Sequence, residues 1–237
     1  KHIFGIKGSY AVDPQKGAVV MTLTTQGDAP IHYTLDGSEP TAASPRYTGP
    51  VEIGKSARFR ATALREGGEN ASYSREFAFS KSTGRPAVLN TKPNDSYTFE
   101  GASLLVDGYH SRPVFTSGAW LGYLDEPLDV TIDMGGEQSY RSVELETLAE
   151  KGDWIFPPSS VTVWVSDNGT DFTEVASVTV PEAKAGDADG IGRYRMQFPE
   201  TSARYLKVVA QNAAAIPAWH PGAGSKGFLF VDEIVVE

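Results

Sequence analysis

Apolar and polar residues alternate along most of the chain with a period of two, as a half-buried β-strand requires. In the first third of the chain, the alternation is clear in AVVMTLTT (18–25), ARFRATAL (57–64) and REFAFS (75–80). Turn residues such as Asp36-Gly37 and Gly67-Gly68 separate these runs. Strands that recur about every 10–15 residues, without helical periodicity, predict antiparallel β-sandwiches.

Strand-like runs continue to the C-terminus after the polar stretch SKSTGRPA (80–87), whose Gly and Pro are typical of a linker. They are LDVTIDMG (128–135), RSVELETLA (141–149), SSVTVWVSDNGTDFTEVASVTV (159–180), GRYRMQF (192–198), ARYLKVVAQN (203–212) and FLFVDEIVV (228–236). Asn168-Gly169 inside the longest run predicts a type I′ hairpin. We therefore predict two β domains, residues 1–82 and 88–237, joined by a linker at 83–87.

Charge supports a boundary near residue 85, because residues 1–85 carry a formal charge of +3 and residues 86–237 carry −12. The net charge of −9 argues against a nucleic-acid-binding protein. The absence of Cys excludes disulfides and thiolate metal sites. No apolar run approaches the ~18 residues of a membrane span. Since KHIFGIKGSY has no initiator Met and no apolar signal-peptide core, we expect an excised piece of a longer polypeptide.

Two sets of segments resemble known domain families. IHYTLDGSEPTAASPRYTGPVEI (31–53) resembles the small immunoglobulin-like domain at the C-terminus of chitobiases and β-N-acetylhexosaminidases. Five later segments, taken in order, resemble a discoidin or F5/8 type C domain, the galactose-binding-like jelly roll that also houses family 32 carbohydrate-binding modules. These are LLVDGYHS (104–111), LDVTIDMGG (128–136), PPSSVTVWVSDNGTDF (157–172), ARYLKVVAQN (203–212) and FVDEIVV (230–236).

The resemblance implies an all-β chain: an Ig-like or fibronectin III-like β-sandwich followed by a galactose-binding-like (discoidin) β-jelly roll. This order resembles the C-terminal region of a family 20 glycoside hydrolase, a β-N-acetylhexosaminidase that is secreted, periplasmic or on the cell surface. The catalytic barrel of such an enzyme needs roughly 250 residues, and no part of this chain could form one. Although hexosaminidases use adjacent Asp-Glu on the barrel, Asp232-Glu233 lies in a terminal strand, so we expect no catalysis from this chain.

Candidate sugar-binding residues lie in two loops rich in Gly and Pro. Trp219 and His220 occupy one loop, and Asp153 and Trp154 occupy the other. A Trp face can stack on a pyranose ring, and His220 could hydrogen-bond the sugar hydroxyls. The alternative is that these side chains plug one end of the core or pack against a neighbouring domain. The expected partner of this monomer is accordingly either a glycan or the catalytic barrel of the same polypeptide.

The resemblance also implies one structural Ca²⁺ near the start of the second domain. Asp107, in an Asp-Gly turn, matches the turn ligand and Glu233 the ligand from the final strand. Ser111 could add a hydroxyl, since Ca²⁺ takes several oxygen ligands. Tyr109-His110 replaces the polar run that usually follows the Asp-Gly, so a turn held by the Asp side chain stays an alternative. The Asp187-x-Asp189-Gly190 spacing has the form of a calcium loop but lacks the later Glu, which favours a solvated hairpin loop.

Overall fold

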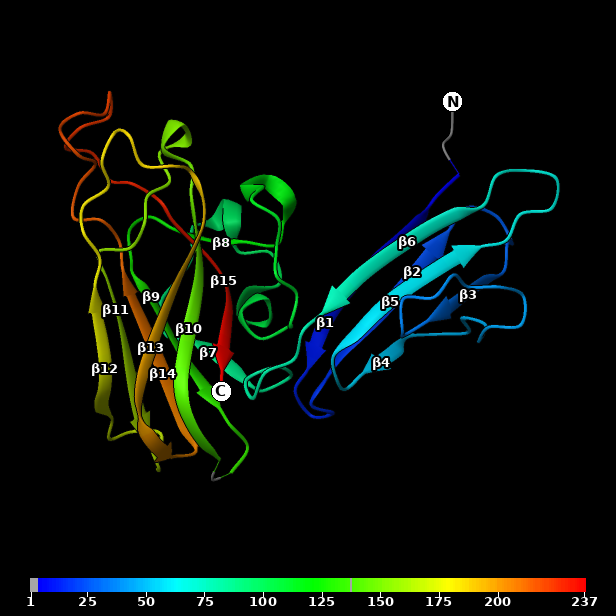
Figure 1. Cartoon of the computed structure of the whole chain (residues 1–237), viewed down its shortest axis with the longest axis horizontal. Helices are drawn as coiled ribbons and strands as arrows, with labels where there is room; N and C mark the ends of the chain where they lie inside the picture. The colour runs from blue at the N-terminus through cyan, green and yellow to red at the C-terminus, as the bar shows by residue number, and fades with distance from the viewer. Residues whose placement is uncertain (1–3, 137) are drawn as a thin grey trace.

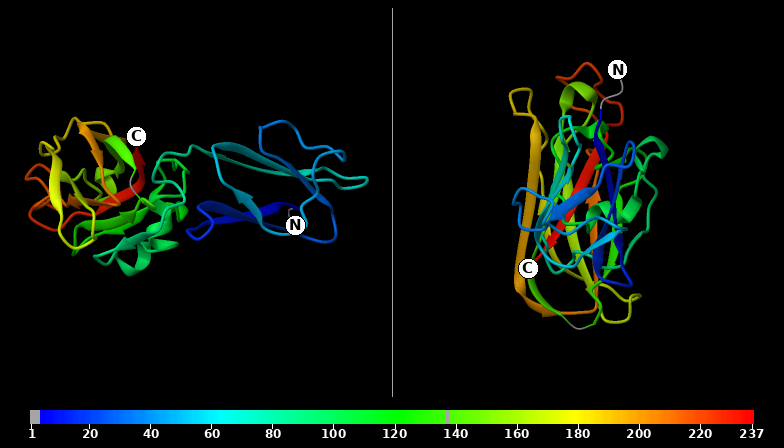
Figure 2. Two further views of the ribbon diagram at one scale, coloured as in Figure 1. Left: turned by 90° about the horizontal axis from the view of Figure 1, so that it is seen from below. Right: turned by 90° about the vertical axis from the view of Figure 1, so that its right-hand side faces the viewer.

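The computed structural model describes residues 4–136 and 138–237, and within them it is an all-β protein of two sandwiches that lie side by side along the longest axis (Figures 1 and 2). No described helix is long and apolar enough to cross a lipid bilayer. The predicted all-β fold class is confirmed, and the structure shows two small sheets followed by a jelly-roll-like sandwich.

The first sandwich consists of two three-stranded sheets with the orders β1-β2-β4 and β3-β5-β6. Its strands are β1 (Ile6–Asp13), β2 (Ala18–Thr25), β3 (Ile31–Thr34), β4 (Val51–Ile53), β5 (Ala57–Ala63) and β6 (Ala71–Phe77). Alternate side chains of both sheets meet in one core, where Met21, Ile53, Phe59 and Phe77 are buried. The period-two pattern of β2 and β5 therefore arises because one face of each strand packs on the opposite sheet, as the sequence predicts.

The second sandwich pairs a four-stranded sheet, β13-β10-β15-β8, with a five-stranded sheet, β12-β11-β14-β9-β7. Its strands are β7 (Ala87–Leu89), β8 (Leu121–Tyr123), β9 (Leu128–Asp133), β10 (Ser139–Ala149), β11 (Ser160–Ser166), β12 (Thr173–Thr179), β13 (Gly190–Ser202), β14 (Tyr205–Gln211) and β15 (Leu229–Val236). Short 3₁₀ turns stand in the loops: η1 (Asp95–Tyr97), η2 (Gly101–Leu105), η3 (Phe115–Ser117) and η4 (Lys151–Asp153).

β15 is buried on both faces, which explains its nearly continuous apolar run. One face packs in the sandwich core, where Val231 and Ile234 are fully buried. On the other face, Phe230 contacts Tyr97 of η1 and Phe115 of η3, with ring centroids 4.8 and 5.7 Å apart. The long loop between β7 and β8 therefore covers the outer face of the four-stranded sheet, and it carries Asp107 to β15.

The polar segment between β6 and β7 is packed between the two sandwiches, and Ser82 is fully buried. The Ser82 hydroxyl donates to the Ile234 carbonyl at 2.6 Å, and the Lys81 amide donates to the Val236 carbonyl at 3.0 Å. The Gly84 amide donates to the Val106 carbonyl at 2.9 Å. Its hydroxyls and amides thus satisfy backbone carbonyls of the second sandwich, so polarity here marks a segment that is hydrogen-bonded to that sandwich.

Two details of the sequence prediction are wrong. The strand expected at 75–80 is β6 at Ala71–Phe77, because the Ala78 amide already bonds the Gly108 carbonyl across the junction. β11 and β12 do form a hairpin, but its turn is not type I′. That turn needs positive φ at both central residues, whereas among the described residues near this turn only Gly169 has it. Asn168 instead accepts the Thr170 and Asp171 amides on its side-chain oxygen, which closes a longer loop.

Candidate functional site

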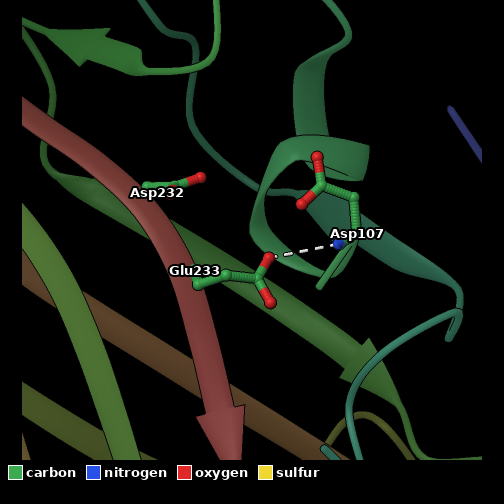
Figure 3. A group of neighbouring side chains, drawn as sticks. All are labelled: Asp107, Asp232 and Glu233. Carbon is green, nitrogen blue, oxygen red and sulfur yellow. Dashed lines mark hydrogen bonds between the residues drawn. The ribbon is translucent and has the colours of Figure 1, made fainter. Parts of the chain in front are cut away.

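A β-bulge in β15 brings two neighbouring acids to the same place. Adjacent residues of a regular strand point to opposite faces. In the pairing of β10 with β15, however, Leu145 faces Ile234 and Thr147 faces Val231, so Asp232 and Glu233 together stand opposite Glu146 alone. An extra residue of this kind re-aims side chains. Figure 3 shows both side chains leaving β15 toward the loop that carries Asp107.

Asp107, Asp232 and Glu233 form a buried acidic triad, with one oxygen of each lying within 4.8 Å of the others. The Asp107 and Gly108 amides donate to the two Glu233 carboxylate oxygens, each at 3.1 Å. The Ser111 amide donates to Asp232 Oδ2 at 2.8 Å, whereas Asp232 Oδ1 is buried without a partner. Burial raises the pKa of Asp107 to about 7 and, together with the Asp107 charge, raises the pKa values of Asp232 and Glu233 well above their ordinary range.

These residues fit a hard divalent cation. Three carboxylates this close cannot all be ionised without a compensating charge, so the triad holds either protons or a cation. The oxygen-only ligand set and the unpartnered Asp232 Oδ1 match the preference of Ca²⁺ for several oxygens. Asp107 and Glu233, the two ligands expected from sequence, lie together, and Asp232 joins them. The expected Asp turn exists as well, since the Tyr109 amide donates to Asp107 Oδ1 at 2.9 Å.

A fourth buried acid, Glu146, faces the bulge but has its own cationic partners. Its Oε1 contacts His110 Nδ1, and Arg193 Nε lies 3.4 Å away. This hydrogen bond raises the pKa of His110 and favours the imidazolium form. Glu146 is thereby neutralised from within the protein, whereas the acidic triad is not.

The two loops that carry the predicted sugar-binding residues lie at one end of the second sandwich, on the yellow-green and orange-red segments of Figure 1. Trp154 follows η4 with a left-handed φ of 64°, and its ring lies against Gly222 of the other loop. The Phe228 amide donates to the Trp154 carbonyl at 2.8 Å, which ties the loop to the start of β15. The side chain nevertheless stays 42% exposed, so it is neither core nor freely mobile.

Trp219 is held in a similar way and stays 39% exposed. Its indole Nε1 donates to the Ala183 carbonyl at 2.9 Å, which links its loop to the β12–β13 loop. His220 lies between the two indoles, with ring centroids 5.5 Å from Trp219 and 6.0 Å from Trp154. The two predicted Trp loops are therefore neighbours in space.

His220 is buried, and both ring nitrogens are engaged inside the protein. Nδ1 accepts the Gly222 amide at 3.0 Å, so Nε2 carries the proton and donates it to the Lys151 carbonyl at 2.8 Å. In this structure the ring therefore braces the two Trp loops, and a direct hydrogen bond from His220 to a sugar stays a prediction. Asp153 is exposed beside Trp154, and burial, together with the nearby Asp153 carboxylate, raises the pKa of Glu150.

Lys151 is a central residue of this loop cluster that the sequence did not reveal. Its buried ammonium donates to the Asp187 carbonyl at 2.7 Å and to Asp189 Oδ1 at 2.5 Å. The Asp187-x-Asp189 segment therefore encloses a lysine cation. Asp232 was also missed as a member of the acidic triad. Asp232 was missed because a bulge leaves no periodic signal in the sequence. Lys151 was missed because lysine side chains are almost always exposed.

The two predicted domain types are confirmed by family comparison. Residues 10–75 match the family model described as Chitobiase/beta-hexosaminidase C-terminal domain, and residues 90–226 match F5/8 type C domain. No curated protein matches the chain.

Solved structures with similar coordinates include three sugar-related modules. Chitosan-binding module 1 of a Paenibacillus sp. IK-5 chitosanase/glucanase is 17% identical with a TM-score of 0.43, over 67% of this chain and 98% of that one. Chitosan-binding module 2 of that enzyme, in complex with chitotriose, is 18% identical with a TM-score of 0.42, over 66% and 98%. CBM32-3 of a Clostridium perfringens family 31 glycoside hydrolase is 16% identical with a TM-score of 0.42, over 68% and 94%. The F5/8 type C domain model matches residues 90–226, which are more than half of this chain, so the chain belongs to the F5/8 type C domain family.

Proposed function

We propose that this chain is a non-catalytic accessory region of a glycoside hydrolase, in which the second domain binds carbohydrate. We further propose that the parent enzyme is a β-N-acetylhexosaminidase, exported from the cell, and that the first domain is a rigid spacer. The family matches support this assignment, because one of them is described as a Chitobiase/beta-hexosaminidase C-terminal domain. The proposed division is the one predicted from sequence, at residues 83–87.

The observation that carries the proposal is the pair of half-exposed indoles, Trp154 and Trp219, on either side of His220. An exposed indole face can stack on the apolar face of a pyranose ring. Both rings are fixed by contacts on their inner side, to Gly222 and to the Ala183 carbonyl. A fixed platform loses little conformational freedom on binding, which improves affinity. The exposed Asp153 carboxylate beside Trp154 is available to accept hydroxyl hydrogen bonds.

A second function, docking to a neighbouring catalytic domain, has its own supporting observation. A groove of about 330 Å³ lies beside Trp219, between the β12–β13 and β14–β15 loops. Its walls are mostly apolar and include Phe156, Pro158, Pro181 and Ile216. Such a groove suits an apolar segment of another domain. The indoles would then be part of an interface within the parent enzyme.

Titration of the whole chain with chitobiose and chitotriose, followed by NMR, distinguishes these functions. We expect binding in the range of about 10⁻³–10⁻⁵ M, or roughly −4 to −7 kcal/mol, because a single module offers only a few stacking contacts. Trp219→Ala and Trp154→Ala should each abolish or strongly weaken the shifts. Phe99→Ala is the matched control, since Phe99 is also half-exposed but lies on a different loop. Unchanged titrations in both Trp variants would contradict the sugar site.

We also propose that the acidic triad binds one Ca²⁺ with a structural role. Asp107, Asp232 and Glu233 would supply the charged ligands, and the cation would hold the Asp107–Gly108 loop against β15. This loop also contacts the junction, because the Gly108 carbonyl accepts the Ala78 amide. The cation would therefore stabilise the sugar-binding domain and its attachment to the first domain. We expect a monomer in solution.

A further inference from the structure

Two features of the chain are not used by the proposed sugar site. The first is the positive charge of the N-terminal part, which contrasts with a strongly acidic second domain. The second is Tyr109-His110, which stands where a calcium loop would usually continue with small polar residues. The structure brings both features to one place, the junction between the two sandwiches.

A cleft of about 490 Å³ opens at this junction. The first domain contributes Arg58 and Arg60 of β5 and Tyr73 and Arg75 of β6. The loop after Asp107 contributes the opposite wall, consisting of Tyr109, His110 and Arg112. Cavities of roughly 300–1,000 Å³ are typical of small-ligand sites, so the cleft can admit a short oligosaccharide but not a folded partner.

Arg75 is fixed at the centre of the cleft by aromatic rings from both domains. Its guanidinium carbon lies 5.0 Å from the Tyr73 ring centroid and 5.3 Å from that of Tyr109. One terminal nitrogen donates to the Ser74 carbonyl at 3.0 Å, whereas Nε is buried with no partner. The Tyr73 hydroxyl is also buried and unpartnered. Unsatisfied donors of this kind are costly, so the polar capacity of Arg75 is not fully used within the protein.

Charge in the cleft is only partly compensated. Arg60 pairs with Glu39, and Arg58 lies 3.8 Å from Glu76 with both side chains largely exposed. Within the described residues, Arg112 is exposed and forms no ion pair. Planar guanidinium groups bind carboxylates and sulfates with two parallel hydrogen bonds. The cleft therefore presents a fixed Arg75 and a free Arg112, one from each domain.

We propose that this interdomain cleft binds the anionic group, a carboxylate or a sulfate ester, of an acidic oligosaccharide. The anion would bridge Arg75 and Arg112, with Arg58 and Arg60 at the entrance and the two tyrosine rings flanking the sugar. Nucleic acid is the less suitable ligand, because the second domain carries −12 and would repel a long polyanion outside the cleft. The site needs both domains in place, and two hydrogen bonds link them: the Val12 amide donates to Ser103 Oγ at 2.9 Å, and the Ala78 amide donates to the Gly108 carbonyl at 2.8 Å.

Isothermal titration of the whole chain with a trigalacturonate, a sulfated chondroitin disaccharide and a neutral chitotriose tests the proposal at two salt concentrations. We expect at least one acidic probe to bind, with an affinity that falls as salt rises, because the contact is ionic. Arg112→Gln should weaken this binding at least tenfold. Arg141→Gln, which makes the same charge change at an exposed position of β10, is the matched control and should bind as the unmodified chain does.

The two acidic probes identify the source of the anion, since binding of one alone assigns the cleft to uronates or to sulfated sugars. Binding by the Trp154→Ala/Trp219→Ala double variant should be unchanged, which separates this site from the proposed sugar platform. No acidic-probe binding, an equal loss in Arg112→Gln and Arg141→Gln, or tighter binding of a short single-stranded DNA would overturn the proposal. None of these outcomes affects chitotriose binding at the Trp loops, so the two proposals can fail separately.

Discussion

Asp232→Asn is the most informative perturbation of the acidic triad, because the asparagine is isosteric and its hydrogen bonds can be kept. The amide oxygen can retain the bond from the Ser111 amide, which is 2.8 Å in the structure. The new NH₂ group takes the place of the unpartnered Oδ1 and can donate to a neighbouring carboxylate. The substitution therefore removes one of three ionisable carboxyl groups without opening a cavity.

The expected size of the effect follows from the spacing of the carboxylates. Two unit charges 4.8 Å apart repel by about 3 kcal/mol at an effective dielectric constant of about 20. Asp232→Asn removes a carboxyl group that in the metal-free protein must either hold a proton or repel Asp107 and Glu233, so the variant should melt at a higher temperature than the unmodified chain in EDTA. Saturating Ca²⁺ at about 100 times its dissociation constant stabilises a folded protein by about 2.7 kcal/mol. At about 2–4 °C per kcal/mol, this raises the melting temperature of the unmodified chain by roughly 5–11 °C.

Calorimetry at pH 7.5, in EDTA and in Ca²⁺, measures both effects. The unmodified chain should gain stability with Ca²⁺, and Asp232→Asn should gain less while starting higher. Glu174→Gln on β12 is the matched control, because it removes a charge from an exposed side chain outside the triad. Our reasoning is refuted if Ca²⁺ leaves the melting temperature of the unmodified chain unchanged and Asp232→Asn melts in EDTA at the same temperature as the unmodified chain. The triad would then neither bind a cation nor destabilise the metal-free protein.

Three further predictions concern the triad and the Trp loops. In EDTA the free energy of unfolding should fall as pH rises from about 4 to about 7. The pKa of Asp107 is raised from 3.8 to about 7 in the folded protein, so between these pH values the folded protein binds more protons than the unfolded chain. Urea midpoints that stay constant across this range would show that the shift is absent. Gly222→Ala should displace the Trp154 ring, because the new Cβ would lie 2.8 Å from Trp154 Cζ2. The variant should bind chitotriose more weakly, with little change in its melting temperature. A chitotriose affinity equal to that of the unmodified chain would show that Trp154 is not part of the sugar-binding platform. Lys151→Met should lower the free energy of unfolding by about 1.5–3 kcal/mol, because the charged hydrogen bonds of Lys151 are lost. Lys226→Met, at an exposed position, is the control and should change the free energy of unfolding by less than about 1 kcal/mol. Equal urea midpoints for the two variants would contradict the role of Lys151.

Local pattern was sufficient for the strands that have one buried face. β9 begins where the alternation of LDVTIDMG begins, and its buried positions Leu128, Val130 and Ile132 are those that the period of two selects. The same holds for β2. In each case the strand packs one face against an opposite sheet, so apolar and polar residues alternate along it and the sequence shows the pattern directly.

The candidate sites were only partly predictable. Asp107 and Glu233 were found because a family resemblance placed them, and Trp154 and Trp219 because they lie in loops rich in Gly and Pro. Their proximity could not be derived from the sequence, since the segments that carry them are 65 or more residues apart. His220 was expected to contact a ligand, yet only the folded loops show that both of its nitrogens are already bonded.

By itself, the sequence determined the all-β class, the two domains and the turn chemistry between most strands, because those properties depend on neighbouring residues and on the period of two. The tertiary structure alone decided that Asp232 and Glu233 face the same way, that residues 82–84 are buried, and that Arg75 and Arg112 face one cleft. Those properties depend on the register between distant strands and on how two domains pack. Both are set by the summed burial and hydrogen bonding of the whole chain, which no short window of sequence contains.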